Sequence, residues 1–184
     1  STNYSGDTYI YIAIRRGPMK IPTSGATVFF PSTASTGTQI PTGFNPDLWI
    51  GGSTSGDGGS SAQITMDRVR GANYLGTSST AEALVMYLDL TSGQDSSLPW
   101  DFNNTEQTAT QFTTRAGSNG AVNLSGSTYV TYLFASCPGV SKIAIVNHVE
   151  PTTVVCGFVP RYIWIKSTQN TGTNDWFVFN SASG

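Results

Sequence analysis

The sequence predicts an all-β protein whose antiparallel strands form a sandwich or jelly roll. Short runs rich in Val, Ile, Thr, Tyr, Phe and Trp recur along its 184 residues, and Gly-, Pro- and Ser-rich turns separate them. No stretch places apolar residues at helical spacing, and even Ala81–Leu90, which contains helix-favouring residues, lacks a polar face. The motif Gly-Phe-x-Pro introduces a strand at Gly43 and returns at Gly157, so we expect about one and a half copies of one β unit.

In the first half, β-branched and aromatic residues mark each expected strand. Gly43 can adopt the positive φ of a tight turn, Phe44 can pack as an anchor, and Pro46 sets the entry to a strand. Pro31 should end the strand before it, because proline cannot donate to a ladder, and Gly51–Ser61 has the composition of a flexible hairpin loop. The expected strands are Thr8–Ile14, Thr27–Phe30, Leu48–Ile50, Ala62–Val69 and Ala81–Leu90.

The second half contains further strand-like runs, and two of its predicted pairings are hairpins around turn residues. The expected strands are Thr108–Thr114 and Thr128–Ala135, then the hairpin of Lys142–Asn147 with Thr152–Cys156 and the hairpin of Tyr162–Lys166 with Asp175–Asn180.

Three segments align without gaps with later ones, which indicates an internal duplication. Ser5–Pro18 matches Ser125–Pro138 at an offset of 120. The Gly-Phe-x-Pro motif repeats at an offset of 114, and Met66–Gly71 matches Phe179–Gly184 at an offset of 113. The motif residues are Gly43, Phe44, Pro46 and Trp49 in the first copy, and Gly157, Phe158, Pro160, Trp164 and Trp176 in the second.

These offsets divide the chain into the closing strand of a preceding repeat (residues 1–18), a complete sandwich unit (residues 19–138) and the first half of a following repeat (residues 139–184). Half a sandwich leaves an apolar face and strand edges exposed. We expect neighbouring segments or subunits to cover those edges. Alternatively, the two half-units pack on each other within the chain.

The composition argues against several functions. Only 11% of the residues are charged and the net charge is −2, so the clustered basic residues that nucleic-acid binding needs are missing. No apolar run is long enough to span a membrane, and the first residues do not have the pattern of a signal peptide. Two cysteines, Cys137 and Cys156, are too few for a disulfide scaffold; a single bridge between them is one interpretation, and two free thiols are the favoured one.

Seven motifs carry a family signal through their order and spacing: Thr8–Met19, Gly43–Ile50 and Asp67–Gly71, then Tyr132–Lys142, Cys156–Phe158, Tyr162–Lys166 and Asp175–Gly184. Together they resemble a recurrent module of tailed-bacteriophage virion proteins, found in repeat-containing tails or tail fibres with concanavalin A-like, laminin-G-like sandwiches. The resemblance does not extend to Ala72–Asn123. It implies a virion surface protein in an oligomeric appendage and supplies no catalytic or binding residues. Ser183 departs from the family pattern, which has Arg there.

A concanavalin A-like fold raises the question of glycosidase activity, which needs two carboxylates about 5 Å apart. Glu82, Glu106 and Glu150 are isolated from one another in the sequence, and Asp89 stands alone at a strand end. His148 is the sole histidine and has no nucleophile elbow beside it, nor enough partners for a zinc site. We therefore predict that the protein is not an enzyme and has no catalytic residues.

The loop Asp95–Glu106 is the candidate for specific recognition. Its carboxylate and amide oxygens suit Ca²⁺, although the spacing is not that of an EF-hand, and its two aromatic side chains can stack on a sugar ring of a host glycan. Alternatively, Trp100 fills the sandwich and the polar residues only solvate the loop. The candidate ligand-binding residues are Asp95, Trp100, Asp101, Phe102, Asn103, Asn104 and Glu106.

Two groups of motif residues point to structure rather than chemistry. Asp67, Arg68 and Arg70 form a charge cluster at a strand end, with a subunit contact as a further interpretation. Trp49, Trp164 and Trp176 lie on expected strands, where indoles are more often core than ligand platforms. The expected function is therefore a structural and adhesive virion component that forms homo-oligomers or binds other virion proteins. A glycan-binding module is the alternative, and a depolymerase is the least favoured.

Overall fold

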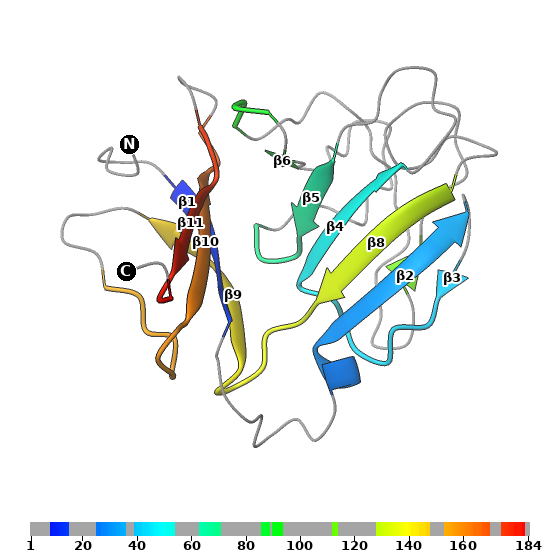
Figure 1. Cartoon of the computed structure of the whole chain (residues 1–184), viewed down its shortest axis with the longest axis horizontal. Helices are drawn as coiled ribbons and strands as arrows, with labels where there is room; N and C mark the ends of the chain where they lie inside the picture. Colours follow the sequence, from blue (N-terminus) through cyan, green and yellow to red (C-terminus); the bar gives the residue numbers. More distant parts are fainter. Residues whose placement is uncertain are drawn as a thin grey trace.

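A computed structural model describes residues 8–14, 25–35, 39–53, 63–70, 86–88, 90–93, 112–113, 128–147, 153–169 and 174–182, and the structural statements below concern these residues. They form an antiparallel all-β sandwich, which confirms the predicted fold class (Figure 1). The elements are β1 (Thr8–Ile14), the 3₁₀ turn η1 (Gly25–Thr27), β2 (Phe29–Ser35), β3 (Gln39–Ile40), β4 (Leu48–Ser53), β5 (Ile64–Asp67), β6 (Met86–Tyr87), β7 (Phe112–Thr113), β8 (Thr128–Phe134), β9 (Ser141–Asn147), β10 (Tyr162–Ser167) and β11 (Phe177–Asn180).

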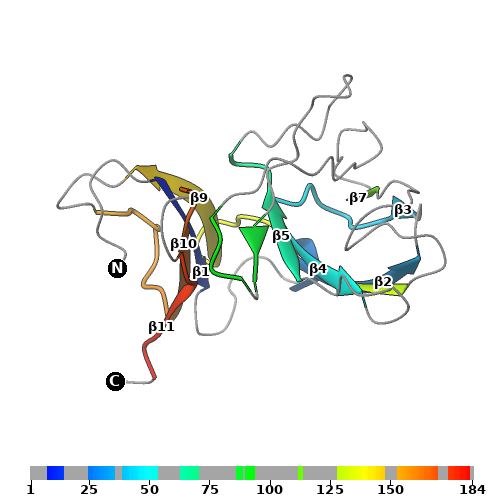
Figure 2. The ribbon, with the colours of Figure 1, turned by 90° about the horizontal axis from the view of Figure 1, so that it is seen from above.

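Two sheets make up the sandwich. The β1 sheet has the strand order β11-β10-β1-β9, and the β4 sheet has the order β2-β8-β4-β5-β6. A separate pair, β3 with β7, lies at the β2 end of the molecule, away from the β1 sheet (Figures 1 and 2). Among the described residues, none belongs to a helix long and apolar enough to cross a membrane.

The core lies between the two sheets. Ile12 and Ile143 from the β1 sheet pack against Leu48 and Ile50 from the β4 sheet, and Trp164 joins them from β10. Full burial of such a side chain contributes roughly 1.5–3 kcal/mol. Trp164 is thus partly buried against the core, in keeping with the expectation for an indole on a strand.

The β4 sheet is buried on its other face as well. Trp49 lies opposite Met66 on β5 and Leu133 on β8, and all three side chains are at most 1% exposed. Trp49 is thus a core residue, as predicted. Because side chains alternate along a strand, Trp49 and Ile50 point to opposite faces of a sheet that is covered on both.

The two sheets repeat the same strand order and the same register. Ile14 pairs with Tyr162 and with Ser141 in the β1 sheet, as Phe134 pairs with Leu48 and with Phe29 in the β4 sheet. Tyr162–Asn180 likewise corresponds to Leu48–Asp67. Strands β9, β1, β10 and β11 are therefore the counterparts of β2, β8, β4 and β5, and the internal duplication that the sequence indicates is present in the backbone pairing.

The first strand of the chain closes the sheet formed by its last strands. β1 lies between β9 and β10 and is antiparallel to both. Of the two alternatives for the half-units, the structure thus contains the one in which they pack on each other within the chain. The boundaries after residues 18 and 138 remain predictions.

Two strand predictions are wrong: one concerns where β2 ends and the other concerns which strand pairs with β9. β2 does not end at Pro31 but continues to Ser35, because β2 is an edge strand and a proline there removes no ladder bond from a second neighbour. Residues 153–156 form no strand with β9; β9 pairs with β1 instead, since β1 offers a seven-residue apolar partner.

Other predictions differ from the structure in extent. Gly51 and Gly52 belong to β4 rather than to a loop. All four residues of β5 are buried, so its alternation separates two buried faces and not a polar from an apolar face. Of the strand predicted at Ala81–Leu90, residues 86 and 87 form β6 and residues 88 and 90 lie outside it, while residues 81–85 and 89 are outside the described part of the chain. Cys137 and Cys156 are free, half-buried thiols, as favoured.

Candidate functional site

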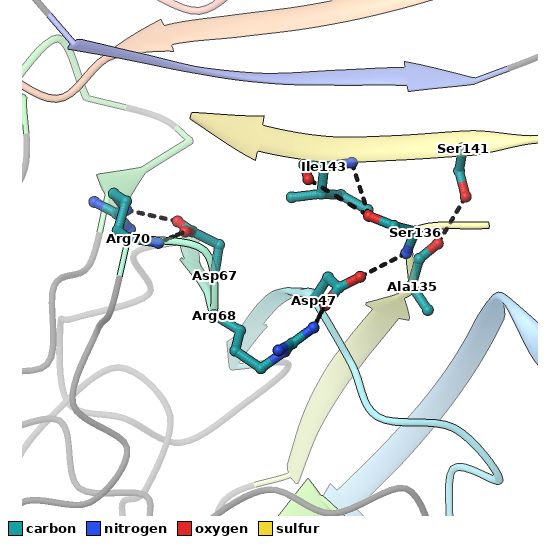
Figure 3. Close-up of polar contacts among 8 residues, drawn as sticks. All are labelled: Asp47, Asp67, Arg68, Arg70, Ala135, Ser136, Ser141 and Ile143. Carbon is teal, nitrogen blue, oxygen red and sulfur yellow. Dashed lines mark hydrogen bonds and ion pairs between the residues drawn. The ribbon is translucent and has the colours of Figure 1, made fainter. Parts of the chain in front are cut away.

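Asp47 fixes the point where the chain crosses from one sheet to the other. It follows the turn at Gly43, whose φ is +77°, and immediately precedes β4. Its carboxylate binds the guanidinium of Arg68 and accepts a hydrogen bond of 2.7 Å from the Ser136 amide (Figure 3). Ser136 lies between β8 and β9, and its hydroxyl accepts a 3.0 Å bond from the Ile143 amide. One buried carboxylate therefore joins β4, the end of β5 and the crossing segment.

Asp67 and Arg70 form a buried ion pair beside it. The Arg70 Nε donates to Asp67 Oδ2 at 2.6 Å, and the Arg70 amide donates to Oδ1 at 2.9 Å (Figure 3). Both side chains are at most 3% exposed. Burial raises the pKa of Asp67, and the charge and hydrogen bonds of Arg70 oppose that rise. The pair satisfies buried groups within the chain, which is a structural role.

Lys166 holds the β6 segment against the β1 sheet. Its side chain on β10 is fully buried, and its Nζ donates to the carbonyls of Tyr87 and Leu90, each at 2.8 Å. The Trp176 indole N–H also donates to the Tyr87 carbonyl, at 2.9 Å, and its ring lies 5.4 Å from Lys166 Nζ. β6 belongs to the β4 sheet, so these bonds close one side of the sandwich.

The two copies share their backbone bonds and differ in their charges. The Arg68 amide donates to the Asp47 carbonyl at 2.9 Å, and the Ser181 amide donates to the Arg161 carbonyl at the same distance. Gly157 has a φ of +79°, like Gly43. In the second copy, however, Arg161 and Asn180 stand where the first copy has Asp47 and Asp67.

The outer face of the β1 sheet is apolar and partly uncovered. We define it by Ile163, Ile165, Phe177 and Phe179, which pair across β10 and β11 and point away from the core. Phe179 is 52% exposed, whereas its counterpart in the β4 sheet, Met66, is fully buried.

The segment before β10 follows the same pattern. Val155 and Val159 are 80% and 82% exposed. Phe158 is only half-buried, whereas its counterpart Phe44 is buried. The same backbone unit thus occurs once covered and once open, and the open copy is the candidate interaction surface.

The predicted recognition loop lies outside the described residues. This applies to Asp95, Trp100, Asp101, Phe102, Asn103, Asn104 and Glu106, and also to Glu82, Asp89, His148 and Glu150. Within the described part of the chain, no group of three His, Cys, Asp or Glu side chains could hold a metal ion. Ca²⁺ binding and glycan binding by the loop therefore stay predictions.

The predicted motif residues fall into three places. Gly43, Phe44 and Pro46 form the turn into β4, and Gly157, Phe158 and Pro160 form the equivalent turn into β10. Trp164 and Trp176 lie together, with ring centroids 4.7 Å apart, although Trp176 precedes β11 instead of belonging to it. The charge cluster is split, because Asp67 pairs with Arg70 while Arg68 pairs with Asp47.

Sequence reasoning missed Asp47, Ser136 and Lys166. A signal exists for two of them, since Asp47 and Lys166 are single charges next to apolar strand residues, in Pro-Asp-Leu-Trp-Ile and Tyr-Ile-Trp-Ile-Lys. Charged residues are seldom fully buried without partners. Ser136 has no such signal, because its role depends on where the chain changes sheets.

A family profile described as "Domain of unknown function (DUF7483)" matches residues 74–183, which is more than half of the chain. The matched range includes β6 to β11 and so extends over both sheets. No curated protein and no solved structure matches the chain.

Proposed function

Because the chain belongs to the DUF7483 family, a domain of unknown function, its function must be inferred from its own architecture, and we propose that it is a structural and adhesive component of a bacteriophage virion. It would act in a tail, tail fibre or other surface appendage, as a repeated β unit that contributes to assembly. The resemblance of its motifs to concanavalin A-like modules of phage tail proteins supports this proposal.

One observation carries the assembly role. The β1 and β4 sheets have the same order and register, yet Met66 is buried where Phe179 is half exposed. An exposed apolar patch on a protein surface often marks a site where another protein binds. The low proportion of charged residues, 11%, also suits a surface that packs against further protein.

The polar clusters support a structural role over a catalytic one. The charged groups of Asp47, Asp67 and Lys166 each form ion pairs or hydrogen bonds with groups of the same chain. Buried charges that are fully engaged in this way specify a packing arrangement and leave nothing to bind a substrate.

The experiment is to locate the protein in purified virions. Mass spectrometry of virions separated on a density gradient should detect the chain at a constant ratio to the tail proteins, and gold-labelled antibodies should mark an appendage. Recovery of the chain only from the lysate, with none in the virions, would contradict the proposal.

The adhesive part is separated from the structural part by Trp100→Ala in the recognition loop. If the loop attaches the virion to host glycans, this variant assembles normally and adsorbs to cells poorly. Unchanged adsorption would leave a purely structural component. A loss of assembly together with adsorption would instead indicate that Trp100 fills the sandwich.

A further inference from the structure

We infer that the exposed edge of β11 is a docking site for a β6-type strand supplied by another repeat of this family. We define the β11 edge as residues 177–179. The inference rests on the proposed function of assembly through repeats, and it names the contact by which one repeat would join the next. It is carried by the difference between β11 and its counterpart β5.

In the first copy, the equivalent strand β5 has a partner on both sides. β5 pairs with β4, the equivalent of β10, on one side. On its other side it pairs with β6, where Ile64 lies opposite Tyr87 and Thr65 lies opposite Met86. The Leu88 amide adds a 2.8 Å bond to the Gln63 carbonyl, and the Thr65 hydroxyl donates to the Met86 carbonyl at 3.3 Å. The chain thus contains the docked form of the contact.

β11 has the same backbone position, and no strand among the described residues pairs with its other side. It pairs with β10 in the register in which β5 pairs with β4, and it is the last strand in the order of the β1 sheet. Val178 and Phe179 are 51% and 52% exposed, whereas Thr65 and Met66 at the same positions are fully buried. The matched register means that a strand shaped like β6 would meet equivalent backbone groups.

The other two sheet edges formed by the duplicated unit carry residues that block pairing. β2 has Pro31, and β9 has the exposed Lys142. Proline and outward-pointing lysine are the usual means of protecting an edge. β11, with the sequence Phe-Val-Phe-Asn, contains neither.

The chemistry of the edge defines its partner. It would accept a short extended segment with apolar side chains on both faces, as in Met86 and Tyr87 of β6. Val178 replaces the hydroxyl of Thr65, so the second copy relies more on apolar contact than the first. A charged or helical partner would not satisfy the ladder.

The test uses the whole chain and a synthetic peptide of residues 82–92, with amide hydrogen exchange as the measurement. We expect the peptide to slow exchange of the Val178 amide at least about tenfold, because this amide faces away from β10 and a new ladder bond would make its exchange depend on local opening. The same peptide with Leu88→Pro should give no protection, since it lacks the amide that donates to the Gln63 carbonyl in the docked form.

Two variants make the test specific. Val178→Lys blocks the edge and should abolish the protection, while the control Val159→Lys changes a more exposed valine off the edge and should retain it. Near-ultraviolet circular dichroism checks that each variant is folded. If Val178→Lys is unfolded, Phe179→Lys on the other face of the strand replaces it.

Three results would overturn the inference. Exchange of the Val178 amide is unaffected by saturating peptide. Alternatively, the peptide alters exchange at 64–67, which means that it displaces β6 from its own sheet. Finally, the peptide protects the Val178→Lys variant as strongly as the parent protein, which means that the peptide binds away from the β11 edge. The virion experiment is independent of all three, so either proposal can fail alone.

Discussion

Single residues differ between the two copies at equivalent positions of β4 and β10, where the side chains on one face of the strand are different. The first copy has Trp49 with Gly51, and the second has Ile163 with Ile165 at the corresponding positions. A Cβ atom at Gly51 would fall on the indole of Trp49. The absence of a side chain at Gly51 is therefore required by the neighbouring tryptophan and not by the backbone conformation.

Gly51→Ala should consequently destabilise the protein. The added methyl group overpacks a buried site, which costs about 1–3 kcal/mol. Urea unfolding followed by tryptophan fluorescence measures the loss. Val155→Ala, which shortens an exposed side chain, is the control and should change the free energy of unfolding by less than about 0.5 kcal/mol. Equal stability of Gly51→Ala and the parent protein would mean that Trp49 can move aside.

Asp67 should make stability depend on pH. Because burial raises its pKa above the ordinary value of 3.8, the folded state holds the proton more tightly than the unfolded state. The resulting stabilisation is complete below the unfolded pKa and is lost as the pH rises through the folded pKa.

The measurement compares the parent protein with Asp67→Asn in urea titrations from about pH 3 upward. The parent should lose stability relative to the variant across the window that begins near the unfolded pKa. A parent that gains stability relative to Asp67→Asn over this window would show that Arg70 outweighs burial.

At the scale of elements, the β6 segment is held by polar bonds from the opposite sheet. Lys166 and Trp176 reach the same carbonyl of Tyr87, and the Asn174 amide donates to the Thr91 carbonyl at 2.6 Å. A segment with only two residues in the ladder needs such support, because a short ladder gains few hydrogen bonds for the ordering of its backbone.

Lys166→Met tests this support. The methionine keeps the apolar length of the side chain but removes the charged donor to the Leu90 carbonyl, and a hydrogen bond to a charged group contributes about 1.5–3 kcal/mol. We expect a lower urea midpoint and faster amide exchange at 86–88. Lys142→Met, on the same sheet but exposed, should change neither. Identical effects of the two substitutions would refute a specific role for Lys166.

At the scale of the whole molecule, the β1 sheet is made from both ends of the described chain. β1 is separated from β9 and β10 by the entire β4 sheet in sequence, and it lies between them in space. The closing strand therefore makes a long-range pairing, which is costly in loop-closure entropy.

A cross-strand disulfide would detect this closure. Ala13 pairs with Ile163, and Cα atoms of paired antiparallel residues lie about 4.5–5.5 Å apart, within the range of a disulfide. In a background with Cys137→Ser and Cys156→Ser, Ala13→Cys with Ile163→Cys should oxidise to a crosslinked monomer on non-reducing gels. Ala13→Cys alone is the control. Covalent dimers from the double variant would mean that β1 closes the sheet of another molecule.

Several long strands and their duplication can be predicted from the sequence, because both depend on local patterns. The β-branched runs at β1, β8, β9 and β10 and the Gly-Phe-x-Pro turns are readable residue by residue. The repeat offsets even anticipate which strands are equivalent.

The pairing of the strands, and which copy of the unit has its apolar residues buried, can be seen only in the tertiary structure. No local pattern states that β1 pairs with β9, that Pro31 lies on an edge, or that Asp47 meets Ser136. These facts depend on contacts between residues far apart in the chain, whose energy is settled by burial on both sides of a sheet. For the same reason, Met66 and Phe179 occupy equivalent positions in the sequence repeat, and only the fold makes one a core residue and the other a half-exposed edge.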